Sequence, residues 1–268
     1  RVPMARLLEA YEYVNASDDG KRGLRYQPVR DGIVLPNHPW SPGAPAAVRG
    51  VPMMIGTTAE ETASMVSSED LRAMYDNDEA IALKVIKASS FLAGDLSLDR
   101  VTAVVKEYRR LMPELDGVGL MVRIATDTGF WRGAVQQAER NVNAGSAPVY
   151  TYELDWPIPI LGRPWAAHGV DISLMFGNPA YGSNVLAEGD NDLERRLLYS
   201  ASEEAALAQK MMKAWAAFAH KGNPSTADAE WPAYNLQNRP TMVFGRNSRV
   251  VNDVRGSIRP LVMHLPGI

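Results

Sequence analysis

The chain has 268 residues, of which 46% are hydrophobic and 22% charged, and it contains no cysteine. This composition is typical of a soluble globular protein with a sizeable core, and the net charge of −3 gives no basic field for nucleic acid or an anionic membrane surface. The missing thiols exclude disulfides and thiolate sites, but they leave cytoplasmic, periplasmic and secreted locations open, and no apolar run is long enough to span a membrane.

One helix and one buried strand are expected in the first 58 residues. Helical spacing of apolar residues predicts a helix over 1–14, and frequent Gly and Pro predict a loop with at most one brief strand over 18–50. Residues 51–58, VPMMIGTT, form a continuous apolar run typical of a buried parallel strand. A helix is expected directly after it, capped by Thr57 or Thr58.

Helices dominate the middle, and strands return in the second half. The apolar periodicity predicts helices over 68–76, 78–92, 98–111, about 116–142, 171–177 and 202–222. Alternation predicts strands over 148–154 and 241–245, and the segments 157–169 and 178–192 are expected to be loops. We expect Ser202 to open the 202–222 helix and Gly222 to close it. The order of elements indicates an α/β protein with an incomplete sheet.

The sequence contains four histidines, His38, His168, His220 and His264. For three of them the simplest interpretation is a surface or helix-end position. His168 differs because it follows a predicted strand and is flanked by Ala166, Ala167 and Gly169, which leave room for a substrate or a partner side chain. By itself this context favours a structural histidine over a catalytic one.

A second feature, GTTAEE at 56–61, lies where a parallel strand gives way to a helix. Sites form at the carboxyl ends of such strands, yet by pattern alone the simplest interpretation of Glu60 and Glu61 is a capped helix start with a solvated face. No HxxH or HExxH pair occurs, and neither GxGxxG nor GxxxxGK[ST] is present, so we expect no metal and no nucleotide cofactor.

Four segments, in this order, resemble the type-B carboxylesterases, the family that includes cholinesterases and bacterial para-nitrobenzyl esterases. They are RYQPVRDGIVLPNHPW (25–40), VPMMIGTTAEET (51–62), APVYTYELDW with PWAAHGVDISLMFGNP (147–179), and MMKAWAAFAHKGNPSTADAEWPAYN (211–235). ATDTGF (125–130) is similar to a further family segment. The resemblance covers most of residues 20–245 and implies the C-terminal portion of an α/β-hydrolase fold, with residues 1–268 as part of one such domain.

The resemblance also implies a reaction and roles for two residues. Glu61 falls on the family's triad acid and His168 on its triad histidine, and Glu60 falls on a neighbouring acidic position. The activity implied is hydrolysis of a small carboxylic ester through a Ser-Glu-His triad and an acyl-enzyme. Trp165, Met175 and Phe176 around His168 are candidates to line a substrate pocket, and core packing is the competing interpretation.

The sequence departs from the family pattern in three places. Thr62 stands where a glycine is usual, and Asp171 where a glutamate often follows the histidine. The largest departure is that no GxSxG elbow occurs, so the nucleophilic serine is expected on an upstream segment, the N-terminal half of the same enzyme. Two alternatives stay open: a cholinesterase-like binding protein without catalysis, and an unrelated α/β protein that matches by chance.

Overall fold

The structure is a computed structural model that describes residues 2–17, 28, 30–73, 75–93, 97–145, 147–179 and 192–265. These residues fall into two units, Arg1–Ser41 and Pro42–Ile268, which are described separately. In the first unit, the predicted N-terminal helix is confirmed as α1 (Met4–Ser17). Of the predicted loop, residues 28 and 30–50 are described, and they form no strand.

A tight turn around Asp31 is the other feature of the first unit. Oδ1 of Asp31 accepts hydrogen bonds from the N–H groups of Ile33, Val34 and Leu35 at 2.9, 2.8 and 2.9 Å. These donors, the Leu35 N–H foremost, lower the pKa of the Asp31 carboxyl. Gly32 has φ 77°, which glycine adopts at little cost. The DG pair therefore makes a turn.

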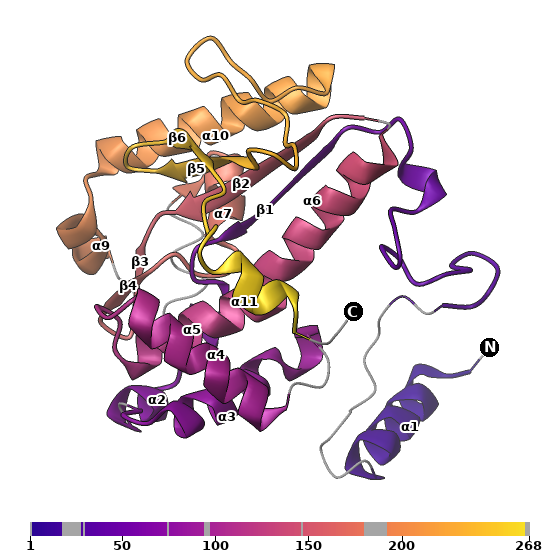
Figure 1. The fold of residues 1–268 in the computed structure, drawn as a ribbon, viewed down its shortest axis with the longest axis vertical. Coiled ribbons are helices and arrows are strands. Elements are labelled where there is room, and N and C mark those ends of the chain that lie inside the picture. The colour runs from indigo at the N-terminus through magenta and orange to yellow at the C-terminus, as the bar shows by residue number, and fades with distance from the viewer. Residues whose placement is uncertain are drawn as a thin grey trace. The chain divides into compact units, whose positions relative to one another are not determined.

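A four-stranded sheet organises the second unit, as Figure 1 shows. Its strands are β1 (Met53–Thr58), β2 (Val149–Asp155), β5 (Pro240–Gly245) and β6 (Arg249–Asn252), in the order β1-β2-β5-β6. The first three are parallel, and β6 pairs antiparallel with β5. The prediction of an α/β fold is therefore confirmed, and the three strands predicted from the sequence are its parallel strands. β6 was not predicted.

The alternation of side chains along β2 places different helices on the two faces of the sheet. The Tyr152 ring lies 5.0 Å from Trp215 of α10 (Ala201–Lys221), and Tyr150 packs on Phe218 of the same helix. Val149, which points to the other face, packs with Ala138 of α6 (Arg132–Ala144). The sheet is therefore covered on both sides, which is the layer arrangement that a parallel sheet requires (Figure 1).

A group of helices packs beside the carboxyl ends of the strands. The predicted helices are confirmed as α2 (Ser68–Ala73), α3 (Asp78–Ala93), α4 (Leu98–Leu111), α5 (Gly117–Thr126) and α6, and α7 (Val170–Met175) follows later. The helix predicted over 116–142 is interrupted by a π-helical turn, η3 (Asp127–Trp131). Such turns are frequent at functional sites, and this one separates α5 from α6.

The remaining differences from prediction concern short elements. The helix expected after β1 is only a 3₁₀ turn, η2 (Glu61–Met65), and neither Thr57 nor Thr58 caps it. The loop predicted over 157–169 contains a hairpin of β3 (Ile158–Ile160) and β4 (Arg163–Trp165). Most of the loop predicted over 178–192 lies outside the described residues, and 3₁₀ helix η1 (Ala46–Val48) and helices α9 (Asp192–Leu198) and α11 (Arg259–Met263) were not predicted.

The N-cap of helix α10 lies two residues earlier than expected. It is Ser200, not Ser202, and Ser200 forms a capping box with Glu203. Gly222 closes the helix in the left-handed conformation with φ 69°, as predicted.

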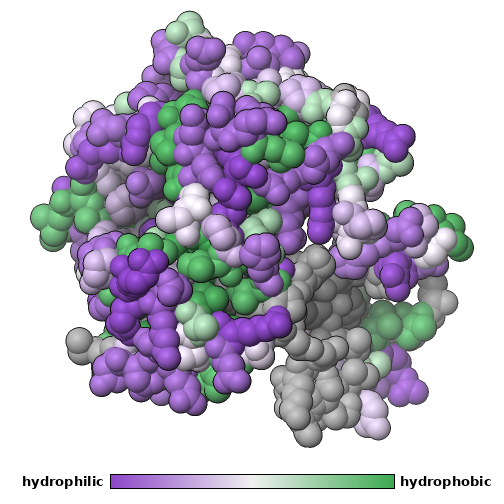
Figure 2. All heavy atoms as spheres, viewed as in Figure 1, coloured by the Kyte–Doolittle hydropathy of each residue, from purple (hydrophilic) through white to green (hydrophobic). Residues whose placement is uncertain are grey.

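None of the helices formed by the described residues is long and apolar enough to cross a membrane. Figure 2 shows one face of the molecule, on which hydrophilic residues predominate and hydrophobic ones show between them.

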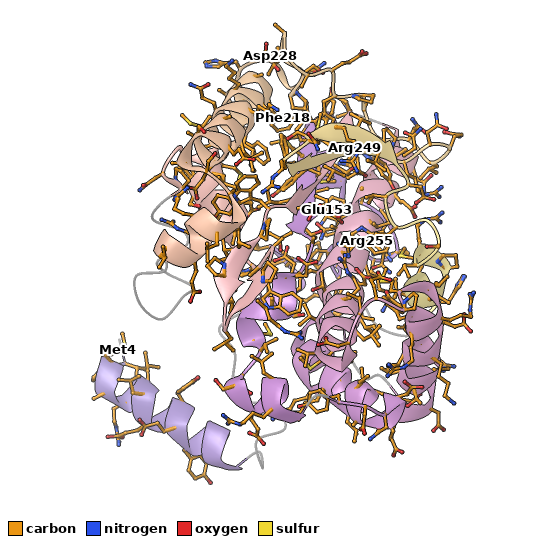
Figure 3. The ribbon with its side chains drawn as sticks, turned by 90° about the vertical axis from the view of Figure 1, so that its left-hand side faces the viewer. Met4, Glu153, Phe218, Asp228, Arg249 and Arg255 are labelled. Carbon is orange, nitrogen blue, oxygen red and sulfur yellow. The ribbon has the colours of Figure 1, made fainter. Side chains whose placement is uncertain are left out.

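A buried group of charges lies between the sheet and α5. Arg255 forms ion pairs with Asp127 of η3 and, at 2.7 Å, with Glu153 of β2. Figure 3 labels Arg255 and Glu153. Its Nη2 also donates to the carbonyl oxygen of Ala59 at 3.2 Å. Tyr108 donates to Asp127 at 2.6 Å. Arg255 therefore joins three segments: the end of β1 through Ala59, β2 through Glu153, and η3 through Asp127.

Candidate active site

The turn after β1 positions the predicted acid, Glu61. Because β1 and β2 are parallel neighbours, their carboxyl ends lie at the same edge of the sheet, and the N–H of Ala59 donates to the carbonyl of Leu154 at 2.9 Å. Glu61 then begins η2, and its Oε1 accepts from the N–H of Thr58 at 2.8 Å. This bond directs the second carboxylate oxygen, Oε2, away from the strand.

The loop after β4 positions the predicted histidine. The main-chain N–H of His168 donates to the carbonyl oxygen of Glu61 at 3.3 Å, so the two backbones touch. Gly169, directly after it, has φ 81° and starts α7. A residue with a Cβ would be strained in this left-handed conformation, so glycine lets the chain turn into the helix immediately behind His168.

The two side chains meet in a short hydrogen bond. Nδ1 of His168 lies 2.6 Å from Oε2 of Glu61. An ionised carboxylate only accepts, so Nδ1 carries the proton and Nε2 of the neutral ring carries a lone pair. The Glu61 side chain is 7% exposed and the His168 side chain 59% exposed, and within the described residues no hydrogen bond reaches Nε2. The structure thus brings together the two residues predicted to act jointly.

The surroundings of His168 favour its protonated form. The hydrogen bond that His168 donates to Glu61 raises the pKa of His168 above its usual 6.5, partial burial opposes the shift, and the charges of Glu61 and Asp171 add to it. Asp171 accepts a hydrogen bond from the Tyr152 hydroxyl at 2.8 Å. Burial is the main cause that raises the pKa of the Asp171 carboxyl. The exposed side chain of His168 therefore lies near two acidic groups, of which Glu61 is buried.

One ring beside His168 was not assigned a role from the sequence. The Phe130 ring lies 5.2 Å from the His168 ring, tilted by 44°. Phe130 lies in η3, within the segment 125–130 that resembles the family, and this resemblance was the only available signal. The contact packs an aromatic ring against the imidazole.

The three predicted pocket residues occupy different environments. Trp165 is buried in the main core, Met175 is partly buried against that core, and Phe176 is 80% exposed. Among the described residues, no hydrogen bond or ring contact joins these three side chains to His168. Their part in substrate binding stays a prediction, and Trp165 has a packing role that accounts for its position.

Thr62, which replaces the glycine usual in the family, is held by hydrogen bonds. Its hydroxyl donates to the carbonyl of Val122 at 2.9 Å and lies 3.2 Å from the hydroxyl of Thr126. The substitution therefore attaches η2 to α5.

Among the described residues, no group of three or more His, Asp or Glu side chains could hold a metal ion.

Comparison with known proteins points to one family. The model of the family described as "Carboxylesterase family" matches residues 1–257. The chain is 28% identical over 232 residues to the para-nitrobenzyl esterase of Bacillus subtilis (strain 168), covering 86% of this chain and 41% of that protein. It is 29% identical over 216 residues to carboxylesterase 4A of Bos taurus, covering 78% of this chain and 36% of that protein.

Solved structures agree with the sequence comparison. A PNB esterase superposes with a TM-score of 0.70 at 25% identity, covering 97% of this chain and 48% of that chain. A carboxylesterase of Geobacillus stearothermophilus superposes with a TM-score of 0.67 at 25% identity, covering 97% of this chain and 49% of that chain. These proteins have the α/β-hydrolase fold, which confirms the predicted fold class. This chain spans less than half the length of each of these relatives.

Proposed function

Since the chain belongs to the carboxylesterase family, we propose that it supplies the acid and the base of a serine hydrolase that cleaves carboxylic esters. Residues 1–268 are then part of a single α/β-hydrolase domain, its C-terminal part. The observation that carries the proposal is the 2.6 Å hydrogen bond between Glu61 and Nδ1 of His168, whose side chain is 59% exposed. The match to the family rules out the alternative of an unrelated α/β protein.

In this proposal His168 moves the proton. Nε2 takes the proton from a serine hydroxyl as that oxygen attacks the ester carbonyl, and returns it to the alcohol that leaves. Water then attacks the acyl-enzyme, and His168 accepts and returns a proton a second time. Glu61 accepts from Nδ1–H throughout, so that it holds the reactive tautomer and stabilises the imidazolium that forms in each step.

The serine itself lies outside this sequence in the proposal. No Gly-x-Ser-x-Gly occurs among the 268 residues, and the longer relatives have more than half of their length outside the matched region. The N-terminal half of the enzyme would bring the serine and the oxyanion donors to the Nε2 side of His168. Each oxyanion donor is worth about 3–4 kcal/mol in related hydrolases.

The substrate is proposed only as a class, a small carboxylic ester. The Bacillus relative is named for a para-nitrobenzyl ester, which makes chromogenic nitrophenyl esters suitable probes. Phe176 is exposed and Met175 partly exposed at the end of α7, eight and seven residues after His168, where they are available to an apolar part of the substrate. Trp165 would contribute by shaping the loop from beneath.

The experiment uses the complete protein, with the segment that precedes residue 1. We expect His168→Ala to abolish turnover of p-nitrophenyl acetate while circular dichroism and Tm stay close to those of the unmodified protein. His264→Ala, which changes a histidine in the C-cap of α11, serves as the control and should keep full activity. If the unmodified complete protein hydrolyses no ester but binds a partner, the non-catalytic, cholinesterase-like alternative is correct.

A further inference from the structure

A second glutamate, Glu60, binds the loop that carries His168. Oε2 of Glu60 accepts from the N–H of Ala166 at 2.9 Å. In the reverse direction, the main-chain N–H of Glu60 donates to the carbonyl oxygen of Ala166 at 2.9 Å. Both backbone groups of Ala166 are therefore satisfied by one residue, which ties the chain two positions before His168 to the chain one position before Glu61.

Arg123 of α5 fixes the other oxygen of Glu60. Its Nη2 lies 2.9 Å from Oε1 of Glu60, and the two side chains are 20% and 18% exposed. A pair this sheltered is screened less by solvent than a surface pair, and both carboxylate oxygens have a partner. Glu60 cannot rotate without breaking the bond to α5 or the bond to the histidine loop.

The bonds of Glu60 and Glu61 together form a two-point attachment. Glu61 holds His168 through its side chain and through its carbonyl oxygen, and Glu60 holds Ala166 through its side chain and its N–H. Without the second attachment, the loop could pivot about His168 and lengthen the 2.6 Å bond. A displacement of about 1 Å in a catalytic group can cost about 100-fold in rate.

We propose that Glu60, anchored by Arg123, is a positioning residue that sets the distance and angle between Glu61 and His168 by clamping Ala166. The inference rests on the proposed function for its catalytic consequence only. The geometric consequence, a weaker bond between Glu61 and His168, is independent of any reaction. A spectroscopic measurement on the resting protein therefore tests it separately.

The test compares three variants of the complete protein. Glu60→Ala removes the side-chain bonds to Ala166 and Arg123 and leaves the main-chain bond to Ala166, whereas Glu60→Gln keeps an acceptor for the N–H of Ala166 and loses the charge that pairs with Arg123. Glu139→Ala is the matched control, because Glu139 pairs with Arg239 at 3.1 Å, the two side chains are 23% and 21% exposed, and the pair lies outside the candidate site. It removes an equally sheltered ion pair without touching the loop.

Two readouts are expected to change together. The first is the hydrogen-bonded Nδ1 proton of His168, observed by NMR far downfield in protein with nitrogen-15-labelled histidine and assigned by its loss in His168→Ala. We expect Glu60→Ala to move it upfield or broaden it, and kcat for p-nitrophenyl acetate to fall about 10- to 100-fold with KM within about twofold. Glu60→Gln should lie between Glu60→Ala and the unmodified protein in both readouts.

The outcomes separate this inference from the proposed function. If Glu60→Ala lowers Tm as Glu139→Ala does but leaves the His168 proton and kcat unchanged, Glu60 is only structural and the inference is wrong. If Glu60→Ala does not fold, Glu60→Gln decides by the same two readouts. If the unmodified protein shows no turnover, the proposed function fails, and the NMR readout alone still supports or overturns the clamp.

Discussion

Oε2 of Glu61 and Nδ1 of His168 lie 2.6 Å apart although 107 residues separate them in the chain. The distance is that of a charge-assisted hydrogen bond, which is about twice as strong as a neutral one. It depends on parallel strands β1 and β2 ending at the same edge of the sheet, and on the hairpin β3–β4 returning the chain to that edge. The pair leads directly to a prediction about pH.

We expect kcat/KM for ester hydrolysis to rise with pH through a single ionisation above 6.5. In its proposed role as a base, His168 must be neutral, and its raised pKa keeps it protonated to a higher pH than a free histidine. The free energy of unfolding should change in the opposite direction and fall as pH rises. The stabilisation from the charged pair is fully present below about 6.5 and is lost as pH rises through the raised pKa.

Asp171→Asn provides the check on this assignment. The negative charge of Asp171 contributes to the raised pKa of His168, so its removal should move the acid limb of the kcat/KM profile to lower pH. The measurement is a pH–rate profile at constant ionic strength in the complete protein. An acid limb that stays in place in Asp171→Asn, or that lies below 6.5 in the unmodified protein, would contradict the assignment to His168.

Glu61→Gln should lower kcat by about 10³- to 10⁴-fold. The amide oxygen of the glutamine can still accept from the N–H of Thr58, and its NH₂ group would then face His168. A donor at that position favours the tautomer with the proton on Nε2, which cannot accept a proton from serine. Steady-state kinetics with p-nitrophenyl acetate provide the measurement.

The control for this substitution is Glu107→Gln, which neutralises an exposed carboxylate paired with Arg110 on the surface of α4. It should keep full activity, because surface pairs contribute about 0–1 kcal/mol and lie away from the chemistry. A loss of less than tenfold in Glu61→Gln would mean that another group orients His168.

Arg255→Ala should destabilise the complete protein by about 3–5 kcal/mol, because it leaves Asp127 and Glu153 buried without a cation. Burial already lowers the pKa of Arg255 to about 9 and raises the pKa of Glu153 to about 7. Without the guanidinium, the two carboxyls would bind protons more readily when folded than when unfolded. The deficit should therefore be larger at pH 8 than at pH 5.

Urea unfolding at the two pH values measures this effect. Arg110→Ala, in which the lost partner belongs to an exposed pair, should change the free energy of unfolding by less than about 1 kcal/mol at either pH. Equal deficits at pH 5 and pH 8 in Arg255→Ala would show that lost packing, not uncompensated charge, causes the destabilisation.

The long elements and the acid–histidine pair were predictable for different reasons. Apolar periodicity was sufficient for α10 and for β2, because each buries a regular face. The local pattern at the site did not indicate which of Glu60 and Glu61 is the triad acid, and only the resemblance to a family pointed to Glu61. Nothing in the sequence near residue 61 indicates a partner 107 residues away, because that contact is created by the sheet.

The features that were missed depend on tertiary context. Pro157, Pro159 and Pro164 argue against strands, yet β3 and β4 pair with each other in a short hairpin that tolerates two of these prolines. Arg255 carries no signal in the sequence, since an arginine is ordinarily exposed and its burial follows from two acids on other elements. The clamp by Glu60 was missed for the same reason, because its partner Ala166 is on a distant loop.

The contact between β1 and β2 near the site requires glycine at position 56. Gly56 lies directly opposite Tyr152 in the sheet, and a Cβ there would overlap both the Tyr152 ring and its carbonyl oxygen. We expect Gly56→Ala to lower the free energy of unfolding of the complete protein by about 1–3 kcal/mol. Gly133→Ala is the control, because a Cβ at that position in α6 meets open space and should stabilise the helix by about 0.5–1 kcal/mol. Urea denaturation measures the free energy of unfolding of both variants, which should change in opposite directions. A Gly56→Ala variant as stable as the unmodified protein would mean that β1 and β2 can move apart at this position without cost.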